Sequence, residues 1–332
     1  MTLWGRPRQV LLWSLLALAV SLLVGLWVGP TPVSFGQLVW SLAHPNQSLV
    51  SVIIWQIRAP RVLAAALVGG SLALAGLVFQ ALLKNPLADP YLIGTSSGAS
   101  LGATLMLMLF PVLAAIPAGA FVGAVAAVLA ATAAARRRSG TSVVTVILVG
   151  YALSVILGAT TALLLTLHAN DLQTIFFWEL GGLGGVLWPQ VWELAAALGV
   201  GSLGVLYLHR ELDAVAIGEE EAHALGIDVA RVRWQLIILA GLVTAVAVSA
   251  SGLIGFVGLV APHVARRLVG SLHRYALPVA VLGGASFLIL ADTIARSIPH
   301  IGEIPVGIVT ALLGGPFFIV LLLRSTRLEG GR

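Results

Sequence analysis

The sequence predicts an all-α integral membrane protein with about ten transmembrane helices, and two observations support this fold class. The chain has 332 residues, of which 59% are hydrophobic and only 9% are charged, whereas a soluble domain has roughly 25% charged residues. Apolar runs of about 18 residues or more also recur from one end of the chain to the other, and this is the length that crosses a bilayer as a helix.

Ten apolar runs are expected to form helices in order along the chain. They cover residues 10–28, 62–83, 92–110, 112–135, 142–167, 190–208, 234–256, 257–270, 276–295 and 304–323. The first follows two arginines, as a signal peptide does, but it is long for one and lacks a small-residue cleavage site, so we expect a retained helix. The eighth is short and broken by Pro262, so it would cross at a tilt or only in part.

Small residues recur at every fourth position in two of these runs. The two sets are Ala65, Gly69 and Ala73, and Gly94, Gly98 and Gly102. Residues four apart lie on one face of a helix, and small side chains let two helix backbones approach closely. We therefore expect both faces to be packing surfaces within the chain.

The basic residues predict the orientation. With ten alternating spans and a cytoplasmic start, fifteen of the 18 Lys and Arg residues lie inside, and only Arg58, Arg61 and Arg296 lie outside. This is the positive-inside pattern, so both termini are expected in the cytoplasm and the chain in the cell (inner) membrane as a multi-pass protein. Because the basic residues lie between apolar spans, they indicate membrane lipid rather than nucleic acid as a partner.

The three outer arginines allow three interpretations. Each would anchor its helix at the interface by extending its charge toward water. Arg296 follows Asp292 by four residues, so these two would also pair along one helix. Alternatively, three cations on the side that otherwise lacks them would form a docking site for an acidic external partner, with rim contacts that weaken as salt rises.

The predicted spans contain almost no ionisable residues, Asp292 and Glu193 being those near the helix ends. A proton- or sodium-coupled carrier normally keeps such groups in its interior, so this class is disfavoured. The only lysine, Lys84, precedes an asparagine and not the Ser or Thr of a Walker A loop, so ATP hydrolysis would belong to a separate subunit.

Enzyme signatures are also absent from the sequence. The motif GTSSG at residues 94–98 formally matches G-x-S-x-G but opens an apolar helix without the strand-to-helix context. There is no cysteine, and the seven histidines lack H-E-x-x-H spacing. An intramembrane enzyme is therefore disfavoured, and no cofactor and no metal site is expected.

The longest inner loop, residues 209–234, predicts a charged helical hairpin. The first helix would end at Gly218, and the second would start at Glu219 and stop at Gly226, because acidic residues favour a helix N-terminus and glycine favours its end. Such a hairpin is either a solvated connector or the place where a separate ATPase pushes. Small residues including Ala222 would let it sit in a partner's groove.

Four stretches resemble the FecCD-type permeases of ATP-binding cassette (ABC) importers, which carry ferric siderophores, haem or cobalamin. These stretches are RAPRVLAAALVGGSLALAGLVFQALLKNPLADPYLIGTSSGASLGA, AIGEEEAHALGI, SGLIGFVGLVAPHVARRLVGSLHRYALP and EIPVGIVTALLGGPFFIVLLLR. They occur in the family's order over essentially the whole chain. A fifth stretch, FFWELGGLGGVLW at residues 176–188, is similar to the cobalamin permease.

The resemblance implies the type II ABC importer permease fold, with residues 1–332 as a single transmembrane permease domain and a cytoplasmic coupling hairpin at about 209–228. It also implies a homodimer with a path along the dimer axis, two ATPase subunits below it, and a periplasmic or lipid-anchored binding protein above it. The expected cargo is an iron complex, a ferric siderophore or haem, and the alternative is cobalamin.

The resemblance also assigns roles to residues. Arg58, Arg61 and Arg296 occupy the positions that meet acidic residues of the binding protein in this family. The hairpin framework would be Gly218, Glu219, Ala222 and Gly226. Thr141 and Ser142, in the stretch SGTS, correspond to a cytoplasmic gate.

Overall fold

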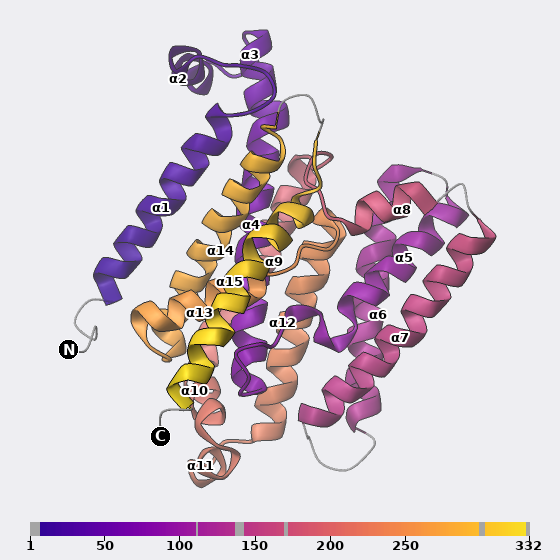
Figure 1. The fold of residues 1–332 in the computed structure, drawn as a ribbon, viewed down its shortest axis with the longest axis vertical. Helices are drawn as coiled ribbons and strands as arrows, with labels where there is room; N and C mark the ends of the chain where they lie inside the picture. Colours follow the sequence, from indigo (N-terminus) through magenta and orange to yellow (C-terminus); the bar gives the residue numbers. More distant parts are fainter. Residues whose placement is uncertain (1–6, 111, 137–142, 169–171, 299–302, 330–332) are drawn as a thin grey trace.

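The structure is a computed structural model that describes residues 7–110, 112–136, 143–168, 172–298 and 303–329. These residues form helices and connecting loops, and no strand occurs within the described ranges. The fold is therefore the all-α membrane fold that the sequence predicts (Figure 1).

A helix overlaps each of the ten predicted apolar runs, with ends that differ by up to six residues from those of the run. The helices are α1 (Pro7–Trp27), α4 (Ala59–Leu82), α5 (Thr95–Leu109), α6 (Ile116–Arg136), α7 (Val143–Leu167), α9 (Trp188–Tyr207), α12 (Val229–Ser251), α13 (Val257–Val269), α14 (His273–Ala295) and α15 (Val306–Glu329). In the described part of the chain, seven helical segments are long and apolar enough to span a membrane, and α5 and the apolar part of α15 are shorter. The 13 residues of α13 extend about 20 Å, less than the roughly 30 Å hydrocarbon core, so this helix crosses only part of the bilayer.

Shorter helices connect the long ones. They are α2 (Phe35–Ala43), α3 (Leu49–Val52), a π-helical turn (Ile53–Arg58), 3₁₀ turns at Pro90–Ile93 and Leu113–Ala115, α8 (Leu172–Glu179), α10 (His209–Ile217) and α11 (Glu219–Ala224). A capping box starts α2, in which Ser34 and Gln37 satisfy each other's backbone N–H groups. The outer loop 29–57 therefore contains the ordered helices α2 and α3 before the chain enters α4.

Helix α4 lies in the centre of the bundle, and 83% of its most apolar window is buried. Its small-residue face packs on α14, where a Cβ added to Gly69 would lie 2.3 Å from the carbonyl oxygen of Gly284. In the second set, Gly98 and Gly102 pack α5 on α6, where a Cβ added to Gly102 would lie 2.0 Å from the carbonyl oxygen of Gly119. Gly94 precedes α5 and faces Gly150 of α7. Both predicted faces are thus packing surfaces within the chain, because any larger side chain would separate the backbones.

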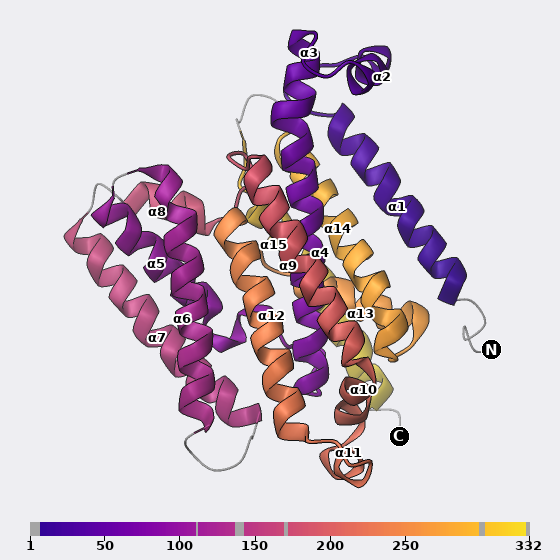
Figure 2. The same cartoon turned by 180° about the vertical axis from the view of Figure 1, so that it is seen from behind.

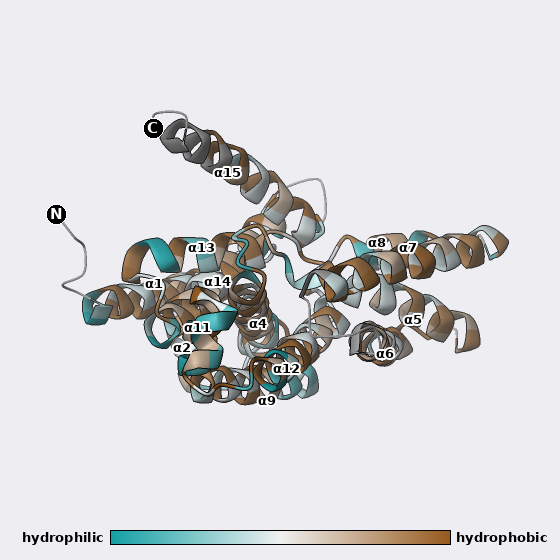
Figure 3. Cartoon of the chain, turned by 90° about the horizontal axis from the view of Figure 1, so that it is seen from below, coloured by the Kyte–Doolittle hydropathy of each residue, from teal (hydrophilic) through white to brown (hydrophobic). Residues whose placement is uncertain are grey.

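The two ends of the bundle differ in what they present. Helices α2 and α3 lie at one end and the hairpin of α10 and α11 at the other, while α5, α6, α7 and α8 form a group at one side (Figures 1 and 2). Helix α1 begins and α15 ends toward the hairpin end. Viewed from that end, the long helices are mainly hydrophobic and hydrophilic residues gather on α11 and α13 (Figure 3).

Candidate functional site

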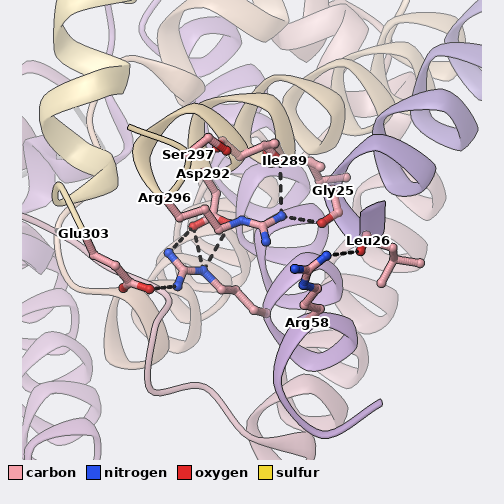
Figure 4. A network of polar contacts seen from close by, with 10 residues as sticks. Gly25, Leu26, Arg58, Ile289, Asp292, Arg296, Ser297 and Glu303 are labelled. Carbon is pink, nitrogen blue, oxygen red and sulfur yellow. Dashed lines mark hydrogen bonds and ion pairs between the residues drawn. The ribbon is translucent and has the colours of Figure 1, made fainter. Parts of the chain in front are cut away.

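The three arginines expected outside belong to one network. Arg58 and Arg296 lie close to Asp292 and Glu303 (Figure 4), and Arg61 bonds to both carboxylates. The start of α4, which carries Arg61, lies at the end of the bundle opposite the hairpin. Arg58 is the last residue of the π-helical turn, Arg61 lies in the first turn of α4, and Arg296 follows the last residue of α14. Arg58 is 3% exposed, Arg61 is 8% exposed and Arg296 is 4% exposed. We call these three residues, with Asp292 and Glu303, the outer cluster.

Asp292 is the centre of the outer cluster and is only 1% exposed. Its carboxylate accepts hydrogen bonds from Arg61 Nε at 3.0 and 3.1 Å and from Arg61 Nη2 at 2.9 Å. Arg296 Nε lies 3.1 Å from Asp292 Oδ2, the pair that the four-residue spacing offered. Arg61 Nη1 also donates to Glu303 Oε1 at 2.7 Å, and the Glu303 side chain is 53% exposed.

Arg58 has no carboxylate partner among the described residues. Its guanidinium donates to the backbone carbonyl oxygens of Leu26 at 2.9 Å and Trp27 at 2.7 Å, and to that of Thr31. Leu26 and Trp27 are the last residues of α1, whose carbonyl groups lack partners within the helix and carry the negative end of its dipole. Arg296 Nη2 similarly donates to the carbonyl oxygen of Gly25. Arg58 and Arg296 therefore cap α1.

The outer cluster differs from the sequence expectation in one respect. Arg58, Arg61 and Arg296 are buried and bonded within the chain, and so they are not solvent-exposed rim charges. The physical reason is that the carbonyl groups at the end of α1 accept hydrogen bonds from Arg58 and Arg296 and that Asp292 lies beside Arg61, so the arginines find partners inside the molecule. Three guanidinium groups against two carboxylates leave the cluster with one excess positive charge.

At the opposite end of the bundle, the hairpin consists of α10 and α11, the two short helices that the sequence predicts. Gly218 separates them in an extended conformation and is buried. Glu219 is the first residue of α11, and Ala222 is fully buried against the bundle. Gly226 follows α11 with a φ of +75°, in the left-handed region where glycine is favoured, and has open space around it.

The outward face of the hairpin combines apolar and acidic residues. Ile217 is 75% exposed and Leu225 is 73% exposed, and Glu220 and Glu221 are exposed beside them. Large apolar side chains this exposed outside the spanning helices are typical of a surface that contacts another protein. The hairpin therefore presents two large apolar side chains among acidic ones.

Comparison with known proteins identifies the family. The model of the FecCD transport family matches residues 17–324, which is nearly the whole chain. The chain belongs to the FecCD transport family. It is therefore the permease subunit of an ABC importer and not an enzyme, and ATP hydrolysis occurs on a separate subunit.

Similar proteins are named for more than one cargo. The FecCD permease is 40% identical to the cobalamin import system permease protein BtuC of Halobacterium salinarum, over 92% of this chain and 85% of the relative. It is 36% identical to the hemin transport system permease protein HmuU of Yersinia pestis, over 98% of both chains. A solved structure of an inward-facing metal-chelate type ABC transporter superposes with a TM-score of 0.86 at 32% identity, covering 95% of this chain and 99% of that one.

Further sequence expectations fall on other parts of the FecCD permease. Thr141 and Ser142, the gate residues, lie outside the described residues. In the described part of the chain, no group of three or more His, Asp or Glu side chains is arranged to hold a metal ion. The sequence did not single out Glu303, although it lies in the stretch EIPVG just before α15.

Asp89 lies between α4 and the 3₁₀ turn Pro90–Ile93 and is not among the residues that the sequence singles out. Its carboxylate accepts a hydrogen bond from the backbone N–H of Tyr91 at 2.8 Å and so caps the 3₁₀ turn Pro90–Ile93. Burial raises the pKa of Asp89 from 3.8 to about 6, and the hydrogen bond from Tyr91 opposes this shift. The turn therefore carries a carboxylate whose ionised form is poorly solvated.

Proposed function

We propose that this FecCD permease moves a large metal chelate into the cytoplasm by alternating access, powered by a separate ATPase. The cargo we favour is a metal macrocycle, haem or cobalamin, ahead of a ferric siderophore. The observation that supports this choice is similarity along the whole chain to permeases named for cobalamin and hemin. Cobalamin has support equal to that of haem, because several relatives near 40% identity carry its name.

The outer cluster is proposed as the docking site for a substrate-binding protein. It has one excess positive charge, and Arg58 has only neutral carbonyl partners among the described residues. An incoming carboxylate would replace the half-exposed Glu303 on Arg61, and Arg58 would contribute its positive charge from its buried position. Arg296 would hold the cluster together through Asp292. Charge complementarity of this kind favours fast and selective association.

The hairpin is proposed as the contact with the ATPase. Gly218, Glu219, Ala222 and Gly226 form its framework, and the exposed side chains of Ile217 and Leu225 face outward. Apolar residues surrounded by acidic ones fit a cleft that offers an apolar floor and basic rim. In this arrangement the hairpin would transmit movement from the ATPase into the bundle.

The remaining parts of the proposal concern assembly. Residues 1–332 would act as one permease domain, two copies would form a homodimer around an axial path, and two ATPase subunits would bind it. Helix α1 begins and α15 ends toward the hairpin end, which supports placing both termini in the cytoplasm of a chain in the cell (inner) membrane. Thr141 and Ser142 remain the proposed cytoplasmic gate.

The experiment that tests the function is reconstitution. The permease would be assembled in vesicles with the ATPase and the binding protein encoded beside it, and supplied with haem, cobalamin or a ferric siderophore. We expect ATP-dependent accumulation of haem or cobalamin that requires the binding protein. Accumulation of the siderophore alone would contradict the cargo proposal. Failure of any ATPase to associate with the permease would contradict the assignment of the hairpin.

A further inference from the structure

Two acidic residues tie the hairpin to the long helices above it. Glu219, on α11, pairs with Arg233 in the first turns of α12. Asp213, on α10, pairs with His273, the first residue of α14. Each helix of the hairpin therefore has its own polar contact with the inner end of a different long helix.

Separating Glu219 from Arg233 would cost free energy, because Arg233 is buried. Arg233 Nη2 lies 2.5 Å from Glu219 Oε1, and the arginine side chain is only 1% exposed. Its Nε and Nη1 atoms are buried and have no hydrogen-bond partner among the described residues. Moving α11 away from α12 would therefore leave a buried guanidinium with no counter-charge, which is strongly unfavourable.

The contact between Asp213 and His273 closes the start of α14. Asp213 Oδ1 accepts a hydrogen bond from the backbone N–H of His273 at 3.0 Å and lies 2.6 Å from the ring Nδ1 atom. The first N–H groups of a helix have no hydrogen-bond acceptor inside the helix. The acceptor is normally a side-chain oxygen of the residue just before the helix. Here the capping oxygen comes from α10, 60 residues earlier in the chain.

Apolar packing lies behind both contacts. Leu212, Val215 and Ala222 on the hairpin are at most 1% exposed and belong to the same buried cluster as Leu236 of α12 and Leu277 of α14. A third polar contact, from Lys84 Nζ at the end of α4 to the carbonyl oxygen of Ile217 at 3.4 Å, is exposed and therefore weaker. Tightly packed interiors transmit displacement because they are hardly compressible.

We propose that Glu219–Arg233 and Asp213–His273 are the contacts through which the hairpin moves α12 and α14. The hairpin and the inner ends of these two helices shift as one body, so that movement imposed on the hairpin reaches the bundle. These four are positioning residues that touch neither ATP nor cargo. The inference rests on the proposed function of the hairpin as the contact with the ATPase.

The first test measures uptake per ATP hydrolysed in vesicles that hold the complete complex. The variants are Glu219→Gln and Asp213→Asn, and the matched control is Glu193→Gln, which removes the same charge from an exposed residue of α9, outside the hairpin and without an ion pair among the described residues. We expect uptake per ATP to fall about tenfold in the two variants, the size of effect that one contact of a network commonly has. ATP hydrolysis itself should persist, and the control should match the unmodified permease.

If the charge variants fail to assemble, a second measurement that does not need them tests the proposal. The chain contains no cysteine, so spin labels can be placed on Arg210→Cys in the hairpin, Leu272→Cys beside α14 and Leu129→Cys on α6, all exposed positions. On ATP binding, the distance from 210 to 272 should stay constant while the distance from 210 to 129 changes. A change in the first distance as large as in the second would overturn the proposal.

The outcomes separate the two proposals. Absence of ATP-dependent uptake by the unmodified complex would count against the proposed function. Uptake by that complex, together with Glu219→Gln and Asp213→Asn variants that keep the uptake per ATP of Glu193→Gln, would count against the rigid link alone.

Discussion

Replacing Glu303 by Gln is the most direct probe of the outer cluster. Glu303 is the one exposed carboxylate of the cluster, and it pairs with Arg61 Nη1 at 2.7 Å. Arg61 keeps its three hydrogen bonds to Asp292 in the Glu303→Gln variant, so the buried part of the cluster is unchanged. The substitution removes one negative charge and raises the excess positive charge of the cluster from one to two.

The expected change in binding free energy follows from the exposed fraction of the Glu303 side chain. The Glu303 side chain is 53% exposed, and solvent-screened ion pairs of this kind contribute about 0.2–1 kcal/mol. A binding-protein carboxylate that replaces Glu303 no longer has to break that pair, so its association should be more favourable by the same amount. This corresponds to a Kd about 1.4-fold to 5-fold lower for the variant.

The assay is a titration of the purified binding protein against the permease in lipid nanodiscs. Measurements at low salt and at 1 M salt separate the electrostatic part, because the screening length falls to about 3 Å at 1 M. Glu220→Gln, which removes a charge at the opposite end of the bundle, is the control. Unchanged or weaker binding by Glu303→Gln, or a gain that persists at 1 M salt, would refute the competition between Glu303 and the partner.

Three further predictions concern stability, each measured by thermal unfolding in detergent. The pKa of Asp89 is raised from 3.8 to about 6 in the folded state. Between pH 3.8 and about pH 6 the folded permease therefore binds more protons than the unfolded one, so its free energy of unfolding falls as pH rises through this range. Asp89→Asn should therefore stabilise the permease at pH 7 by at most about 3 kcal/mol and lose this advantage below about pH 4. Gly76→Ala should destabilise it by about 1–3 kcal/mol, because the added Cβ would lie 1.9 Å from the carbonyl oxygen of Gly258. Asp292→Asn should cost about 3–5 kcal/mol, because two buried guanidinium groups lose their shared carboxylate.

The positions of the long helices could be predicted from the sequence because they depend on local properties. The length of an apolar run and the charges at its ends determine where a helix crosses a membrane. The shortness of α13 follows from the length of its run, but the expected break at Pro262 was wrong, because the helix continues through Pro262 from Val257 to Val269. Local residues likewise determine the boundary between α10 and α11, since Gly218 and the acidic residues after it mark a helix end and a helix start.

The environment of the arginines could not be predicted in the same way. Only the pair of Asp292 with Arg296 lies within one helical turn, whereas Arg61 and Asp292 are 231 residues apart. The partners of Arg58 are backbone carbonyl oxygens, which no side-chain pattern reveals. The start of α2 could have been predicted from the sequence, because Ser34 and Gln37 have the spacing of a capping box.

The same pair of helices connects the two proposed sites. Helix α4 contributes Arg61 to the outer cluster and ends just before Lys84, which reaches the hairpin. Helix α14 begins at His273, which Asp213 of the hairpin caps, and carries Asp292 near its outer end. Between these points the two backbones touch at Gly69, and so closely packed a pair has little room to deform. A displacement of α14 at the hairpin must therefore alter the position of Asp292. The affinity of the permease for the binding protein should then depend on whether the ATPase holds nucleotide. Docking of the binding protein should change the affinity of the ATPase for nucleotide by the same factor.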